Sequence, residues 1–147
     1  MMFTGSIEAK LDEKGRVFFP SSFRKLLPES EREFVLKRDI YQPCLVVFPM
    51  SAWQSEVEVL RTKLNRWNPQ EAMIFRQYLS DAEQFQLDSN GRFILPKRLL
   101  AFAGIDHAVT FVGMDDRIEI WAKRENDFIA PEDYAKAVEA LLGGKTE

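Results

Sequence analysis

The sequence predicts an α+β protein made of two copies of a β-β-α-β-β unit, joined by a helical hairpin and followed by a C-terminal helix. Three observations support this prediction. A ten-residue segment that begins at Leu11 recurs 76 residues later at Leu87. Each copy is followed by apolar residues at helical spacing and then by two short apolar runs typical of strands. Between the copies lie two amphipathic helical patterns.

The two copies of the repeat are identical at five of ten positions, and three more positions are apolar in both. The first runs from Leu11 to Pro20 and the second from Leu87 to Pro96, and each proline is expected to end a strand and start a helix. The flanks match as well. The expected helices end at Pro28 and Gly104, and the expected strands cover residues 34–36 and 45–48 in one copy and 109–111 and 118–121 in the other.

Each copy contains an Asp-x-x-Gly-Arg segment, which predicts a tight turn. Asp12 is placed to accept local backbone N–H bonds, and Gly15 tolerates positive φ. Flanked by strands, the turn is expected to be a hairpin with a glycine bulge, and Arg16 then opens the returning strand. The equivalent residues of the second copy are Asp88, Gly91 and Arg92. Two roles remain open for each Asp–Arg pair, and they can coexist: holding the turn together and contacting a ligand.

The segment between the copies predicts two antiparallel helices. Ser51 and Gln54 have capping-box spacing, an apolar stripe follows up to Trp67, and Asn68-Pro69 starts the second helix. The amphipathic segment from Pro131 to Leu142 predicts a C-terminal helix that docks on its own chain, with a role facing a partner as the alternative. We predict a first domain at 6–53, a helical linker at 54–81, a second domain at 82–125 and a C-terminal helix at 126–147.

Composition excludes several classes of function. The 147 residues are 46% hydrophobic and 29% charged, as in a globular protein, and no apolar run approaches the ~18 residues of a membrane span. The N-terminus does not have the pattern of a signal peptide, so we expect a cytoplasmic protein. The single cysteine, Cys44, excludes an internal disulfide and a multi-cysteine zinc site. With one histidine, His107, and no catalytic motif, we predict no enzyme, cofactor, metal or small-molecule substrate.

Charge is unevenly distributed along the chain. The net charge of the chain is −3, yet the segment from Lys10 to Leu27 contains five basic residues and only two acidic ones. This segment is either a solvated face of mixed charge or a basic patch on an acidic body. His107 is expected to be a loop residue, and Cys44 a small core residue.

Two Leu-Asp-x-x-Gly-Arg-φ-φ-φ-Pro motifs (φ, apolar), the first followed by a helix that carries Arg24, resemble the MraZ family. The similarity extends to Phe3-Thr4-Gly5 and to the strand from Pro43 to Pro49. The resemblance implies two swapped-hairpin units of the SpoVT-AbrB type, which form a small pseudo-barrel. It also implies a bacterial, nucleoid-associated transcriptional regulator, expected to be a repressor. That regulator would bind repeated DNA boxes upstream of its own division and cell-wall operon as a ring-shaped homo-oligomer.

The first hairpin is the better candidate for reading double-stranded DNA, because Lys10 and Lys14 correspond to the neutral Gln86 and Asn90 of the second. A basic hairpin fits a major groove, where arginine contacts guanine. The candidate contact residues are Lys10, Lys14, Arg16, Arg24 and Lys25, with Arg92 secondary, and Asp12, Gly15, Asp88 and Gly91 are the candidate structural residues of the motif. Two alternatives stay open: an oligomeric scaffold for protein interactions, and an antitoxin of the AbrB type.

Overall fold

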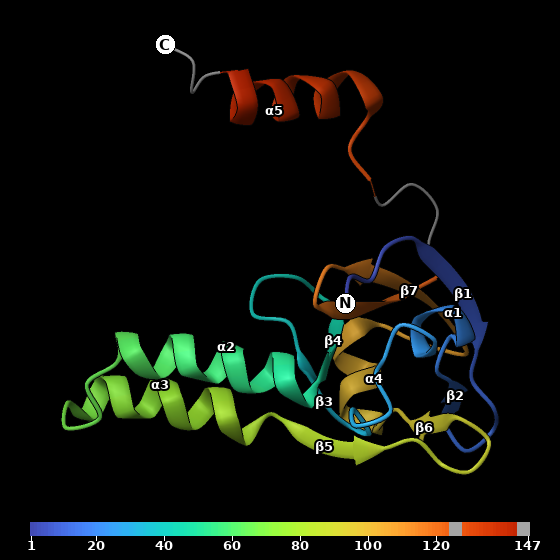
Figure 1. Ribbon diagram of the computed structural model, residues 1–147, viewed down its shortest axis with the longest axis horizontal. Coiled ribbons are helices and arrows are strands. Elements are labelled where there is room, and N and C mark those ends of the chain that lie inside the picture. Colours follow the sequence, from blue (N-terminus) through green and yellow to red (C-terminus); the bar gives the residue numbers. More distant parts are fainter. Residues whose placement is uncertain (124–127, 144–147) are drawn as a thin grey trace.

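The computed structural model describes residues 1–123 and 128–143, and it contains two units with the same order of elements. The first unit comprises β1 (Ser6–Lys10), β2 (Arg16–Phe18), α1 (Ser21–Arg24), β3 (Glu33–Arg38) and β4 (Leu45–Pro49). The second comprises β5 (Glu83–Gln86), β6 (Arg92–Ile94), α4 (Lys97–Ala103), β7 (Ala108–Met114) and β8 (Arg117–Ala122). The predicted α+β fold of tandem β-β-α-β-β units is therefore confirmed, and Figure 1 shows both units in one body.

The two units are interleaved. Six strands form an antiparallel sheet in the order β1-β7-β8-β4-β3-β5, and β2 pairs with β6 in a separate ribbon. Exchanging each strand with its counterpart in the other unit simply reverses this order, so the body has an approximate twofold symmetry. The prediction that each turn joins two strands paired with each other is wrong. The strands beside each turn pair across the units, β1 with β7, β5 with β3, and β2 with β6. A single unit is too small to bury a core and leaves strand edges exposed; the exchange joins both units around one core and leaves only β1 and β5 as edges of the six-stranded sheet.

One hydrophobic core is shared by both units. Its aromatic side chains form a continuous series from the first unit to the second. Phe34 lies 5.2 Å from Phe19 and 5.4 Å from Phe85, and Phe93 lies 4.7 Å from Phe85 and 6.5 Å from Phe111, measured between ring centroids. Such ring pairs stabilise a core beyond the area they bury. The domain boundaries stay predictions, and the one between 125 and 126 and the end at 147 lie outside the described residues.

The helices α2 (Met50–Lys63) and α3 (Pro69–Ser80) form the predicted hairpin, which projects from the body in Figure 1. A second cluster of buried residues lies where they meet the sheet: Val35, Val46, Phe48, Ala52, Trp53, Val57 and Phe75. Trp67 does not belong to the apolar stripe, because α2 ends at Lys63 and this side chain is 94% exposed. The chain turns there, and Asn68 caps α3 by accepting the N–H groups of Gln70 and Glu71.

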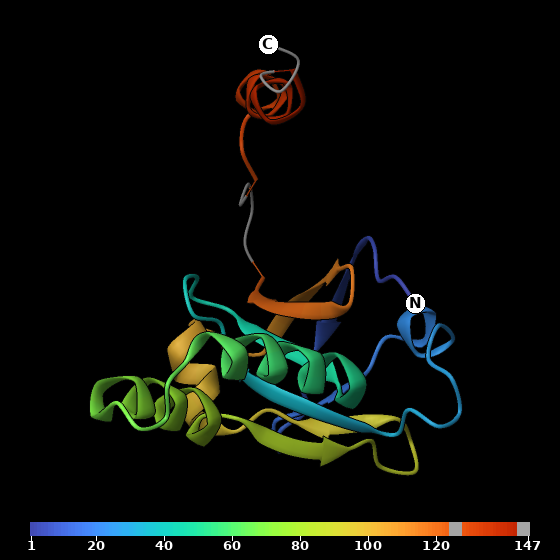
Figure 2. The same ribbon diagram turned by 60° about the vertical axis from the view of Figure 1, so that its left-hand side comes forward.

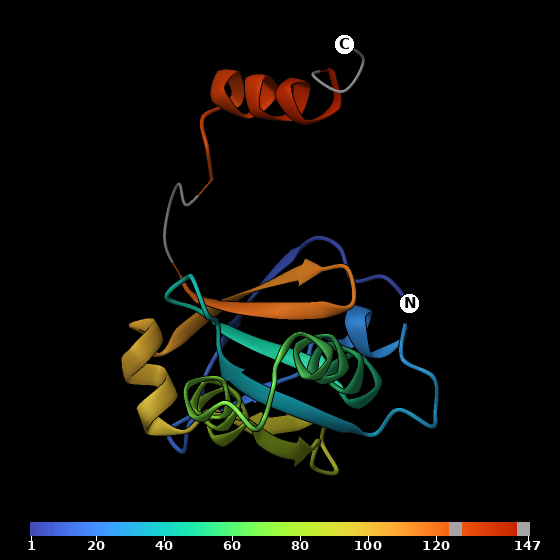
Figure 3. The same ribbon diagram turned by 90° about the vertical axis from the view of Figure 1, so that its left-hand side faces the viewer.

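The helix α5 (Pro131–Gly143) contains no buried residue, so the expectation that it docks on its own chain is wrong. Figures 2 and 3 show it apart from the body. The shared core covers one face of the sheet, and α2 packs on Val35 and Val46 of the other. None of the described helices has the length and apolar character required to cross a bilayer.

Candidate nucleic-acid interface

Asp12 organises the first turn with both oxygens of its carboxylate. Oδ1 accepts the backbone N–H groups of Lys14 and Arg16, each at 2.9 Å, and Oδ2 accepts Nε of Arg16 at 2.7 Å. Gly15 has a φ of 79° and donates its N–H to the Asp12 carbonyl at 3.0 Å. The pKa of Asp12 is lowered, first by the hydrogen bond from the Arg16 backbone, so the carboxylate stays charged beside the guanidinium.

The second turn repeats this arrangement. Asp88 accepts the backbone N–H groups of Asn90 and Arg92 at 2.9 Å and Nε of Arg92 at 3.0 Å. The hydrogen bond from the Arg92 backbone is again the first cause of a lowered pKa of the aspartate. Gly91 has a φ of 83°. The predicted turns are therefore confirmed, and the structural role of each Asp–Arg pair is present in both.

The two turns interlock around the ribbon formed by β2 and β6. Phe19 donates its backbone N–H to the carbonyl of Gly91, and Leu95 donates its own to the carbonyl of Gly15, both at 2.9 Å. Nη1 of Arg92 lies 3.9 Å from Oδ2 of Asp12, which links the two charge pairs across the units. The ribbon thus presents both turns together, although they are 76 residues apart in the chain.

The outward side of this ribbon carries Arg16, Phe18, Arg92 and Ile94, which we call the outer ribbon face. In the antiparallel register Arg16 lies opposite Ile94, and Phe18 lies opposite Arg92, while Val17 and Phe93 between them point into the core. Phe18 and Ile94 are 58% and 59% exposed. The guanidinium of Arg92 lies 5.9 Å from the Phe18 ring centroid. Two arginines and two large apolar side chains therefore share one accessible surface.

The guanidinium groups on this face keep polar atoms available. Each arginine is held to its aspartate through Nε, so its two Nη groups are not used in that bond, although Nη1 of Arg92 also approaches Asp12. Within the described ranges, neither Nη group of Arg16 has a hydrogen-bond or ion-pair partner. A guanidinium fixed in this way can donate two parallel hydrogen bonds to one planar acceptor.

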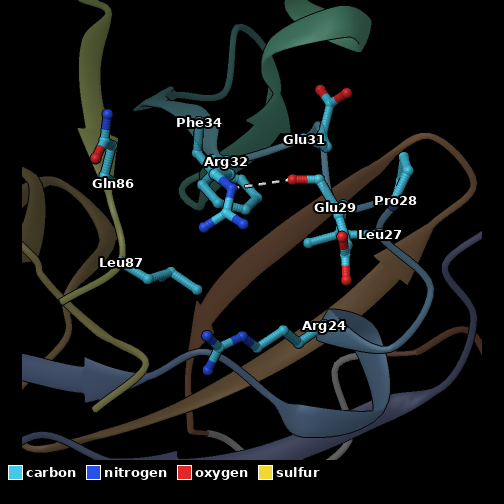
Figure 4. Close-up of a pocket in the computed structure, with 9 residues that line it drawn as sticks. All are labelled: Arg24, Leu27, Pro28, Glu29, Glu31, Arg32, Phe34, Gln86 and Leu87. Atoms are coloured by element: carbon cyan, nitrogen blue, oxygen red, sulfur yellow. Dashed lines mark hydrogen bonds between the residues drawn. The ribbon is translucent and has the colours of Figure 1, made fainter. Parts of the chain in front are cut away.

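Arg24 reaches the second turn from the first unit. Its Nη1 lies 2.7 Å from the position that a Cβ atom would occupy on Gly91. The side chain also lines a pocket of about 290 Å³ together with Arg32, Phe34 and Leu87, drawn in Figure 4. The glutamates Glu29 and Glu31 line the same pocket and balance its two arginines. Arg24 therefore adds positive charge beside Gly91, a placement that the sequence alone did not indicate.

The three candidate lysines are all exposed and lie on different elements. Lys14 is in the first turn, Lys10 ends β1, and Lys25 follows α1. Among the described residues, none of these ammonium groups takes part in an ion pair or a side-chain hydrogen bond. The structure thus brings Lys14, Arg16, Arg24 and Arg92 to the two turns, and it shows no bond that ties Lys10 or Lys25 to them.

An ion cluster lies between the two units and escaped the sequence analysis. It is formed by the buried side chains of Asp81 and Lys37 and the half-exposed side chains of Arg38 and Arg98. Asp81 accepts the backbone N–H of Arg38 at 2.8 Å, its Nε at 3.0 Å and Nη1 of Arg98 at 2.9 Å. Nζ of Lys37 lies 4.0 Å away. Burial by itself raises the pKa of Asp81, but the hydrogen bonds from Arg38 and Arg98 outweigh it and the pKa is lowered. Only the fold brings these separate charges together.

Two sequence comparisons match nearly the whole chain. Residues 2–77 and 78–139 each match the family described as "MraZ protein, putative antitoxin-like". A transcriptional regulator MraZ of Phocaeicola vulgatus is 51% identical over 146 residues, which are 97% of this chain and 95% of that protein. A transcriptional regulator MraZ of Bacteroides thetaiotaomicron is 44% identical, over 95% of this chain and 92% of that protein. That of Serratia proteamaculans is 37% identical, over 82% and 79%.

The chain belongs to the MraZ family. The resemblance carried by the two Leu-Asp-x-x-Gly-Arg motifs is thereby confirmed, and the family match divides the chain into two repeats as the motifs did. The matched relatives are transcriptional regulators, so this MraZ protein is a transcriptional regulator and not an enzyme.

Proposed function

We propose that this MraZ protein is a sequence-specific repressor that binds repeated boxes of double-stranded DNA. The proposed target is the promoter of its own division and cell-wall operon, and the active form is a ring-shaped homo-oligomer on the nucleoid, in the cytoplasm. The observation that supports it best is the outer ribbon face, where Arg16 and Arg92 are both held through Nε by an aspartate. Metals, cofactors and small-molecule substrates have no part in this function.

The chemistry of the outer ribbon face suits a DNA groove. A two-stranded ribbon is slender enough to enter the major groove, where an arginine can donate two hydrogen bonds to O6 and N7 of guanine. Phe18 and Ile94 beside the arginines suit the methyl group of thymine. Lys14 and Arg24, together with Lys10 and Lys25, are assigned to the phosphates, which position a protein without specifying sequence.

One such face with a few cations binds DNA weakly, because salt screens phosphate contacts. In a ring, binding of one subunit to a box brings the outer ribbon faces of its neighbours close to the adjacent boxes. If the boxes are repeated at matching intervals, this high effective concentration strengthens overall binding. Exposed apolar side chains outside the outer ribbon face support self-association. They include Trp67 (94% exposed) between the linker helices and Leu141 and Leu142 (each 68% exposed) on α5.

A gel shift with DNA from immediately upstream of the gene tests the proposal. Arg16→Ala is expected to cost ~1–3 kcal/mol of binding free energy at each base contact. Because the loss is repeated in every subunit of the ring that contacts DNA, specific binding should be abolished. Lys14→Ala is expected to weaken binding to all sequences alike and to reduce the salt dependence. Arg76→Ala on the exposed surface of α3 is the matched control and should bind as the unaltered chain does.

Oligomer size and melting temperature are measured beside the gel shift, because a purely structural role of Arg16 would lower both and lose DNA binding as a consequence. If Arg16→Ala keeps its ring, its melting temperature and its DNA affinity, the assigned surface is wrong. A chain that binds no DNA even at low salt would instead fit the interaction scaffold. A chain that binds a toxin protein and then releases its DNA would instead support the antitoxin alternative.

A further inference from the structure

Three side chains with metal-ligating atoms converge at one end of the six-stranded sheet. None of them belongs to the outer ribbon face. Cys44 directly precedes β4, Asp39 follows β3, and Glu119 lies in β8. The pairing of Val46 with Glu119 puts Cys44 and Glu119 on the same side of adjacent strands, since residues 44 and 46 alternate with 45. The backbone N–H of Asp39 donates to the Cys44 carbonyl at 2.9 Å and closes the group. The Sγ atom and a carboxylate oxygen of each acid all lie within 4.8 Å of one another.

The thiol in this group is fully buried and lacks a partner. Cys44 is 0% exposed, and within the described ranges its Sγ makes no hydrogen bond. Neither Asp39 nor Glu119 takes part in an ion pair with a described residue. Two half-buried carboxylates and a buried thiol thus face one another; the charge of Lys37 interacts with that of Asp39, and a cation bound at the cluster would add to this compensation.

One oxygen of each carboxylate is held in place, and the other is available. Oδ2 of Asp39 accepts the N–H groups of Tyr41 at 3.0 Å and Gln42 at 2.8 Å. Oε1 of Glu119 accepts the indole N–H of Trp121 at 2.9 Å. Hydrogen bonds of this kind orient ligating carboxylates in metal sites. Oδ1 of Asp39 and Oε2 of Glu119 accept no hydrogen bond from a described residue, so these two oxygens and Sγ of Cys44 are the candidate ligand atoms.

We propose that Asp39, Cys44 and Glu119 form a binding site for a divalent cation of the zinc class. A sulfur ligand selects against Mg²⁺ and Ca²⁺, which take oxygen, and favours Zn²⁺ and its analogue Co²⁺. Three protein ligands leave the fourth tetrahedral position to water. Ligands at about 2.0–2.3 Å from one ion lie roughly 3.5 Å apart, so binding draws the three ligand atoms together by at most about an ångström. The ion joins the β3–β4 turn of the first unit to β8 of the second.

The test titrates Co²⁺ into the metal-depleted full chain and records the sulfur-to-cobalt charge-transfer absorption, which reports directly on a bound thiolate. We expect one Co²⁺ per chain, displacement by Zn²⁺, and a higher melting temperature with either ion. Cys44→Ser should remove the charge-transfer band. Asp39→Asn and Glu119→Gln should each weaken binding at least tenfold.

His107→Gln is the control, because it removes the single histidine, an exposed side chain 3.1 Å from Asp106 that could bind metal adventitiously. This variant should bind Co²⁺ as the unaltered chain does. Circular dichroism without metal establishes whether each variant is folded. If Cys44→Ser does not fold, the loss of Co²⁺ binding by Asp39→Asn and Glu119→Gln tests the site instead. A folded chain without the band, or a band unaffected by both acid variants, would overturn the site. None of these measurements depends on DNA, so the site and the proposed function can fail separately.

Discussion

Asp81 offers the sharpest test of how the two units are held together. The substitution Asp81→Asn keeps the shape of the side chain and removes its charge. The amide oxygen of the new side chain can still accept one backbone hydrogen bond, but Lys37, Arg38 and Arg98 lose the carboxylate that they share. The perturbation therefore removes the largest of the negative charges that act on Lys37, whose side chain is only 6% exposed, and leaves the smaller contributions of Asp39 and Glu56.

The magnitude follows from the burial of the partners. Removing one member of a buried ion pair costs ~3–5 kcal/mol, since the remaining charge is left uncompensated. The side chains of Arg38 and Arg98 are 44% and 47% exposed, so water can solvate both. Lys37 also keeps a hydrogen bond from Nζ to the carbonyl of Arg38 at 2.9 Å. We therefore expect a loss near the lower limit, about 3 kcal/mol, which lowers the melting temperature by roughly 6–12 °C for a chain of this size.

Thermal unfolding at pH 7 checks this value, with all variants at one protein concentration because self-association shifts apparent stability. Asp106→Asn is the control, since the Asp106 side chain is 95% exposed and its loss should change little. If Asp81→Asn melts within about 2 °C of the unaltered chain, well below the change expected at this size, the carboxylate does not compensate Lys37 and the reasoning fails.

The pH dependence gives an independent check on the same carboxylate. The pKa of Asp81 is lower in the folded chain than in the unfolded one, because the hydrogen bonds from Arg38 and Arg98 outweigh its burial. Its stabilising contribution is therefore complete above the unfolded pKa, about 4, and is lost as the pH falls through the lower folded value. Asp81→Asn should lose less stability than the unaltered chain between about pH 5 and pH 2. Equal acid sensitivity of the two proteins would contradict this.

Three further predictions concern the turns and the assembly. Gly15→Val should lower the melting temperature far more than Glu13→Val, because a β-branched residue resists the φ of 79° at Gly15; equal melting temperatures would contradict the turn. Phe18→Ser should weaken binding to the promoter boxes several-fold without changing the melting temperature, whereas Val59→Ser on α2 should not affect the gel shift; unchanged binding by Phe18→Ser removes that side chain from the interface. Light scattering should show a homo-oligomer at micromolar concentration, and a monomer of 17.1 kDa would exclude the ring.

Local features were predictable because short segments determine them. Asp12 and Gly15 specify their turn by hydrogen bonds within five residues, and the same is true of Asp88 and Gly91. Gly104 ends α4 in a left-handed conformation with a φ of 65°, as its position predicted. The errors arose where a pattern needed a partner surface. Trp67 fits a helical stripe by spacing alone, and α5 is amphipathic whether or not its own chain covers it.

The sequence by itself determined that the chain is a duplicated α+β protein of the MraZ family, that each copy contains an Asp–Arg turn, and which arginines those turns carry. The tertiary structure decided which strands pair, and through that pairing it placed Arg16 and Arg92 on one ribbon, with the exposed side chain of Phe18 opposite Arg92. It also gathered Asp81 with its three cations, and Cys44 with Asp39 and Glu119, from separate segments. Capping and turn bonds act between neighbours in the chain, whereas strand exchange, charge clusters and ligand sets depend on contacts between distant residues, which only packing creates.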